Sequence, residues 1–66
     1  MPSLNTTVRE RVAREVCSLI SEGYRRIGES DGIITLRHTR NRNRATIVMW
    51  DDCAWLFIKG RLRKVL

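Results

Sequence analysis

Two apolar segments near the C-terminal end limit the folds that this chain can adopt. Residues 45–50 and 54–58 are almost continuously apolar, and only Asp51, Asp52 and Cys53 separate them. Short segments rich in β-branched and aromatic residues are typical of strands, and so short a connection makes the two strands antiparallel. A half-exposed antiparallel strand alternates apolar with polar residues, whereas these segments are apolar at nearly every position. The pattern therefore predicts a hairpin in which both faces favour burial.

The length of the chain leaves room for only one small domain. With 66 residues, of which 42% are hydrophobic and 30% charged, it has a composition near the average of globular domains, which argues against disorder. We expect one domain over 1–66, with a flexible N-terminal tail at 1–6 and a basic C-terminal segment at 61–66. A domain of this size buries only about 60% of the surface of its unfolded chain, which disfavours a deep catalytic cleft.

The first third of the sequence predicts an amphipathic helix over residues 8–27. Apolar residues recur there every three or four positions, which places them on one helical face. Thr7 and Glu10 have the spacing of a capping box, so we expect the helix to start near Thr7. Gly28 is suited to end the helix in a left-handed conformation, and residues 29–32 then form a turn.

The rest of the chain predicts an antiparallel sheet. Strands are expected at about 33–40, 44–50 and 54–59. Residues 61–66 form either a short fourth strand or a basic tail. The expected fold class is α+β, with the N-terminal amphipathic helix on one face of a three- or four-stranded antiparallel sheet in the order α-β-β-β. One helix covers one face, so the other needs a second copy, a partner, or a role as an exposed aromatic platform.

All of the net charge lies in the second half of the chain. Residues 1–33 hold five basic and five acidic side chains, whereas 34–66 hold eight basic and two acidic ones, and 8 − 2 gives the total of +6. Such asymmetry indicates a polyanionic partner, either nucleic acid or an acidic protein surface. The expected nucleic-acid contacts are Arg37, His38, Arg40, Arg42 and Arg44 of the first hairpin, and Lys59, Arg61, Arg63 and Lys64 of the C-terminal segment.

Each basic group also has a simpler interpretation. The hairpin arginines can be a solvated turn that protects an exposed strand edge from aggregation. In the C-terminal segment, Lys59, Arg61 and Arg63 line one side if the chain stays extended through Gly60, and otherwise form a frayed end with non-specific attraction.

Three aromatic residues, Trp50, Trp55 and Phe57, are the second candidate site. Large aromatic side chains of a small domain usually belong to its core. Trp55 and Phe57 are two residues apart and share a face of their strand. If that face points away from the helix, they form an interface or a surface on which bases stack.

Other kinds of site find little support in the sequence. Cys17 and Cys53 are expected to be free thiols, and Asp51 and Asp52 lack companion ligands at a spacing that suits a metal. No catalytic motif, cofactor motif, secretory signal or membrane-spanning segment is recognisable. We therefore expect no enzyme, no cofactor, no metal and no membrane partner, and a cytoplasmic location.

These patterns together favour a small basic nucleic-acid-binding protein with a regulatory or architectural role. We expect a homodimer that contacts DNA or RNA phosphates through the Arg-rich hairpin. The alternative is a non-enzymatic adaptor or inhibitor, of the kind that phages and plasmids encode. It would dock on an acidic protein surface through the same basic strands and an apolar sheet face. Phosphate binding weakens steeply as salt is added, so the salt dependence of binding distinguishes the nucleic-acid-binding protein from the adaptor.

Overall fold

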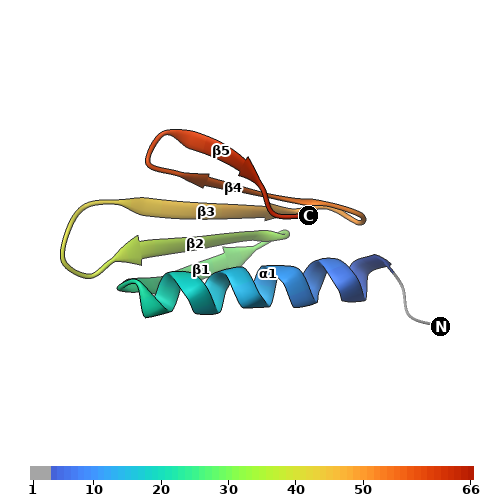
Figure 1. The fold of residues 1–66 in the computed structure, drawn as a ribbon, viewed down its shortest axis with the longest axis horizontal. Helices are drawn as coiled ribbons and strands as arrows, with labels where there is room; N and C mark the ends of the chain where they lie inside the picture. The colour runs from blue at the N-terminus through green and yellow to red at the C-terminus, as the bar shows by residue number, and fades with distance from the viewer. Residues whose placement is uncertain (1–3) are drawn as a thin grey trace.

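The chain forms one helix followed by a five-stranded sheet (Figure 1). The computed structural model describes residues 4–66. Its elements are α1 (Leu4–Ser21), β1 (Tyr24–Ser30), β2 (Ile33–His38), β3 (Arg44–Met49), β4 (Ala54–Ile58) and β5 (Arg61–Lys64). The strands pair in chain order, each antiparallel to its neighbours. The α+β class and the order of helix before sheet are thus confirmed, while the sheet has more strands than the three or four predicted.

The helix ends six residues before the predicted end, and this difference supplies the additional strand. Gly23 has a φ of 109°, a left-handed value that stops the helix after Ser21. Tyr24 and Ile27 continue the helical spacing in the sequence, but they belong to β1. Gly28, predicted to end the helix, lies inside that strand. The predicted range 8–27 was therefore wrong at its C-terminal end.

The beginning of the helix also differs from the prediction. α1 starts at Leu4, so Thr7 lies within the helix and not at its cap. Residues 4–6 of the expected flexible tail are helical, and residues 1–3 lie outside the described residues.

Two tight turns make the sheet a meander. Asp31 and Gly32 have φ values of 52° and 78°, and Lys59 and Gly60 have 53° and 75°. Two successive residues with positive φ are typical of type I′ turns, whose twist matches that of the strands they join. The second turn folds residues 61–64 back onto β4. The alternative of a fourth strand after Gly60 is therefore correct, and it is the fifth strand of the sheet.

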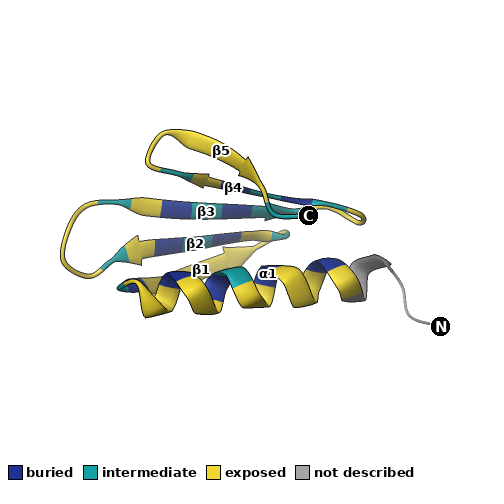
Figure 2. Cartoon of the chain, in the orientation of Figure 1, coloured by how far each residue is buried: buried dark blue, intermediate teal, exposed yellow. Residues whose placement is uncertain are grey.

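The core lies between α1 and one face of the sheet. Figure 2 shows the buried side of α1 facing buried positions of the strands. The buried residues are Val8, Val12, Val16 and Leu19 of the helix, and Tyr24, Ile34, Leu36, Ala45, Ile47, Ala54 and Leu56 of the sheet. Each large apolar side chain buried here contributes about 1.5–3 kcal/mol. We call this the inner face. No described element covers the opposite, outer face, and no helix in the described residues is long and apolar enough to cross a membrane.

Candidate nucleic-acid interface

The order of the strands places many basic residues at one end of the sheet and acidic turns at the other. Successive turns of an antiparallel meander lie at alternate ends, so residues of the same charge in every second turn come together. One end, here called the basic end, carries Arg25, Arg37, Arg40, Arg42, Arg44, Lys59 and Arg61. The other, the acidic end, carries Asp31, Asp51 and Asp52 in its two turns. The strands thus carry a charge gradient, which Arg9 of α1 reduces at the acidic end, where it lies near Asp51.

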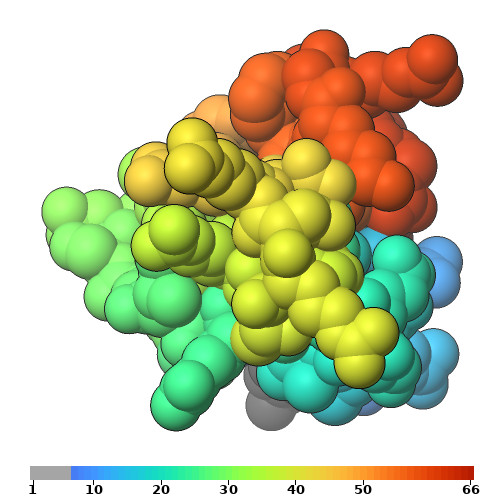
Figure 3. Space-filling model, turned by 90° about the vertical axis from the view of Figure 1, so that its left-hand side faces the viewer, coloured from blue at the N-terminus to red at the C-terminus, as the bar shows by residue number. Residues whose placement is uncertain are grey.

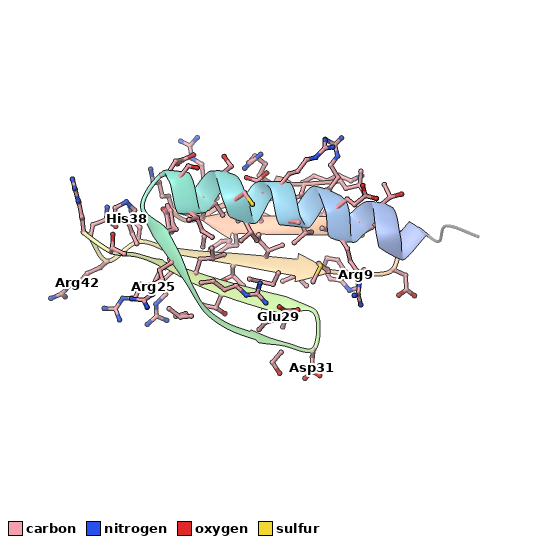
Figure 4. The ribbon with its side chains drawn as sticks, turned by 90° about the horizontal axis from the view of Figure 1, so that it is seen from below. Arg9, Arg25, Glu29, Asp31, His38 and Arg42 are labelled. Carbon is pink, nitrogen blue, oxygen red and sulfur yellow. The ribbon has the colours of Figure 1, made fainter. Side chains whose placement is uncertain are left out.

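Both ends can be followed in the figures. Figure 3 looks at the basic end, where the loop between β2 and β3 (yellow-green) lies between β1 (green) and β5 (red-orange). In Figure 4, Arg25 and Arg42 lie at this end, whereas Asp31 lies at the far tip of the β1–β2 hairpin. Glu22, just after α1, is the acidic residue closest in sequence to Arg25 at the basic end.

Three arginines stand side by side across the outer face at the basic end. Arg25 pairs with Arg37, and Arg37 pairs with Arg44. Directly paired residues of adjacent strands point to the same face, and like charges at such positions destabilise a sheet. All three are exposed, and no ion pair within the described residues neutralises them. This arginine row (Arg25, Arg37 and Arg44) is therefore open to an external anion.

Hydrogen bonds of His38 connect the β2–β3 loop to the end of α1. Its Nε2 lies 3.1 Å from the Glu22 carbonyl oxygen, and its Nδ1 lies 3.0 Å from the backbone nitrogen of Arg40. The carbonyl can only accept and the backbone N–H can only donate, so in these contacts Nε2 donates and Nδ1 accepts. Thr39 adds two hydrogen bonds of 3.0 Å, from its N–H and its Oγ1, to the Gly23 carbonyl. His38 thus positions the loop, since both of its ring nitrogens are already engaged.

The fixed loop holds two further arginines at its tip. The Asn43 N–H donates to the Asn41 side-chain oxygen at 2.9 Å, which closes the turn around Arg42. Arg40 and Arg42 are exposed. Beside them is a shallow hollow of ≈ 490 Å³ lined by Arg25, Ile27, Arg37, His38, Thr39, Arg40, Asn41 and Arg42. Guanidinium groups around an open hollow suit phosphate oxygens, which they bind in a bidentate manner.

The cations of the C-terminal segment do not form the predicted stripe. Lys59 and Arg61 flank the turn at the basic end, because the chain reverses at Gly60. Arg63 lies on the helix side, where its guanidinium donates to the Glu15 carboxylate at 2.6 Å. The single basic line expected from an extended chain is therefore wrong.

The aromatic residues gather on the outer face, as one of the two interpretations predicted. Trp55 pairs with Val48, Phe57 pairs with Thr46, and both strands present these pairs away from α1. Phe57 is 51% exposed and Trp50 is 54% exposed. With their neighbours they form the outer patch, which consists of Ile33, Val48, Trp50, Trp55, Phe57 and Leu62.

A shallow hollow lies within the outer patch and a lysine lies at its edge. The hollow has a volume of ≈ 160 Å³ and is lined by Thr46 and five of the patch residues. Lys64 pairs with Trp55 across β4 and β5, and its Nζ lies 6.0 Å from the centre of the indole ring. The predicted contact residue Lys64 therefore belongs to the outer face and not to the basic end.

Sequence reasoning missed one member of the arginine row. Arg25 was assigned to the helix, and only the pairing of β1 with β2 brings it beside Arg37. The signal that points to it is Gly23, because a glycine followed by an aromatic residue fits the end of a helix and the start of a strand.

The described residues hold neither a metal-binding cluster nor a disulfide. Among them, no three His, Cys, Asp or Glu side chains come close enough to hold a metal ion. Cys17 and Cys53 are both free thiols. Comparison with protein-family models, with curated proteins and with solved structures gives no match for this chain. The interpretation of the site therefore depends on its geometry and charge.

Proposed function

We propose that this chain is a small non-enzymatic protein that binds nucleic acid through its basic end. The observation that carries the proposal is the arginine row, three adjacent like charges without an ion pair among the described residues. Mutual repulsion in the free protein becomes favourable attraction once phosphates lie between the guanidinium groups. The role that we propose for this chain is regulatory or architectural, in the cytoplasm.

The charge gradient gives the bound polymer an orientation. A polyanion is attracted by the basic end and repelled by Asp31, Asp51 and Asp52 at the acidic end. The loop arginines Arg40 and Arg42 extend the contact beyond the edge of the sheet.

The test is a fluorescence-anisotropy titration of labelled duplex DNA, single-stranded DNA and RNA at about 50 and 200 mM salt. The double variant Arg40→Ser/Arg42→Ser removes two phosphate contacts. Each contact contributes about one to the slope of log affinity against log salt, so we expect the slope to fall by about two. The matched control is Arg11→Ser/Arg14→Ser, which removes the same charge from exposed positions of α1. Equal losses in both variants would show attraction by net charge alone.

Docking on an acidic protein surface remains the second candidate, because the outer patch is apolar beside the basic end. Such an interface would depend on apolar contacts that salt hardly weakens. Failure of all three nucleic acids to bind at the lower salt would favour this candidate.

The homodimer stays a prediction. Five strands about 4.8 Å apart, with four to seven residues each at about 3.4 Å per residue, give the outer face a flat extent of roughly 450 Å². Stable interfaces bury about 800 Å² on each partner. We therefore expect a second copy to associate weakly through this face, which the solution mass at micromolar concentrations measures.

A further inference from the structure

We propose that the outer patch stacks the unpaired bases of a single-stranded nucleic acid whose phosphates lie along the arginine row. This inference rests on the proposed function and names the form of nucleic acid that the protein prefers. It assigns a role to Trp50, Trp55 and Phe57, which the basic end does not use.

The first argument is the exposure of the aromatic rings. Trp50 and Phe57 are about half exposed, although a domain of this size has few large side chains with which to build its core. Every nucleobase has a flat face, and stacking on aromatic side chains is the usual way in which proteins hold unpaired bases. Bases within a duplex are already stacked on one another, so a flat sheet face does not reach them.

The second argument is the strand register, which places an aromatic and a basic side chain close together on the outer face. Phe57 pairs with Thr46, and Arg44 precedes Thr46 by two residues on the same face of β3. Two residues along a strand span about 7 Å. A single sugar bridges such a distance, so a base on Phe57 leaves its phosphate beside Arg44.

The third argument is the charge of the whole outer face. The arginine row bounds the patch on one side, and Lys64 bounds it on the other, beside Trp55. The paired outer-face positions of the five strands hold no Asp or Glu, since Glu29 pairs with Ile34 on the inner side. Apolar rings between two cationic borders complement a strand of bases joined by phosphates. They suit the outer face of a second copy less well, because its paired positions offer no carboxylate to the arginine row.

The chain carries its own reporter for this surface. Its only two tryptophans, Trp50 and Trp55, both belong to the outer patch. A stacked base quenches indole fluorescence, so a titration reads the proposed site directly. The probes are oligothymidylate and oligouridylate of about ten nucleotides, which fits the size of known single-strand sites, and an abasic strand of equal length. Saturable quenching by either base-bearing strand supports the proposal, because stacking does not depend on the sugar.

Two variants remove the stacking surface. Phe57→Thr keeps a good strand former at its position, and Trp50→Thr changes a residue just beyond β3. We expect each to weaken binding of the base-bearing strands by about 5- to 100-fold and to leave the abasic strand unaffected. Ile20→Ala is the matched control, because Ile20 is an apolar residue of α1 that is 50% exposed. Circular dichroism establishes that each variant is folded, and the Trp50 variant keeps the test valid if the Phe57 variant is not.

The outcomes separate this inference from the proposed function. Equal affinity for base-bearing and abasic strands, unchanged in Phe57→Thr, would overturn the inference and leave phosphate binding at the basic end intact. If the unmodified protein binds none of the nucleic acid probes, both proposals are overturned. A protein-concentration-dependent change in fluorescence, a mass of two chains, and no competition by oligonucleotide would instead identify a second copy as the occupant.

Discussion

The two faces of the sheet are built from the same strands and differ almost completely in burial. On the inner face Leu36, Ile47 and Leu56 are inaccessible to solvent, whereas Phe57 and Leu62 on the outer face are 51% and 64% exposed. In β4 the residues of both faces are apolar, and it is α1 that distinguishes the two faces. The comparison teaches that apolar content in a small domain has two uses. The residues that the helix covers stabilise the fold, and the equally apolar residues that it leaves uncovered are available for contact with a partner.

Two adjacent residues of β4 test this comparison, and their variants should show the largest difference in the free energy of unfolding. Leu56 is fully buried on the inner face, and Phe57 follows it on the outer face. Leu56→Ala leaves a cavity in the core, so we expect it to lower the free energy of unfolding by about 2–5 kcal/mol. Phe57→Ala removes a half-exposed ring, so we expect a loss of less than about 1.5 kcal/mol. Urea denaturation followed by circular dichroism measures both.

A domain of this size has a total stability of only about 3–5 kcal/mol, so the Leu56 variant is expected to be largely unfolded. Equal losses for the two variants would mean that the outer ring is also buried in solution, and would contradict the division between the faces.

The sequence was sufficient for the strands in which one face is buried. β2, β3 and β4 alternate buried with more exposed positions, and the predicted strands matched them to within two residues at each end. β1 has no such alternation, because only Tyr24 among its seven residues is buried. Its polar positions resemble the outer side of a helix, which explains why the helix was extended through it.

The residues of the candidate site also differ in how far the sequence could predict their position. Arg37, Arg40, Arg42 and Arg44 are close in sequence, so their clustering could be predicted from one hairpin. Arg25 joins them only through strand pairing, which depends on where the helix ends. A bulge at Ile27, the residue skipped in that pairing, also shifts the register of β1. Short-range patterns do not contain this information.

Gly23 determines where α1 ends and thus how much of the inner face it covers. A Cβ at this position would lie 2.7 Å from His38 Nε2, and the φ of 109° is unfavourable for any side chain. We expect Gly23→Ala to lower the free energy of unfolding by about 1–3 kcal/mol. Gly28→Ala is the control, since outside its two chain neighbours no described atom lies within 4 Å of its Cβ position, and its φ is not in the left-handed region. We expect it to be neutral or to stabilise by up to about 1 kcal/mol.

A loss as small as that of the control would show that the helix end tolerates other conformations. Thermal denaturation of both variants gives the comparison.

Among the buried residues that the structure describes, Tyr24 alone has a polar side-chain atom. Its ring is buried and packs edge-on against His38, with the ring centres 4.9 Å apart. Its hydroxyl has no hydrogen-bond partner among the described residues. A buried hydroxyl without a partner is destabilising, so we expect Tyr24→Phe to raise the free energy of unfolding by about 1 kcal/mol. A loss of stability in chemical denaturation would mean that the hydroxyl is hydrogen-bonded in solution, and that the inner face is more polar than described.

The smallest effect is expected where β5 meets the helix. Arg63 and Glu15 form an ion pair in which the side chains are 57% and 19% exposed, so water screens much of their attraction. We expect a double-mutant cycle with Arg63→Gln and Glu15→Gln to give a coupling energy of about 0.2–1 kcal/mol, which decreases as salt is added. Arg61→Gln combined with Glu15→Gln is the control pair, because Arg61 forms no ion pair among the described residues.

β5 has no buried residue, so the ion pair of Arg63 with Glu15 is a specific link between β5 and α1. A coupling no larger than that of the control would show that strand pairing alone positions β5. Lys64 and Leu62 would then owe their places on the outer face to the β4–β5 hairpin, independently of the helix that defines the inner one.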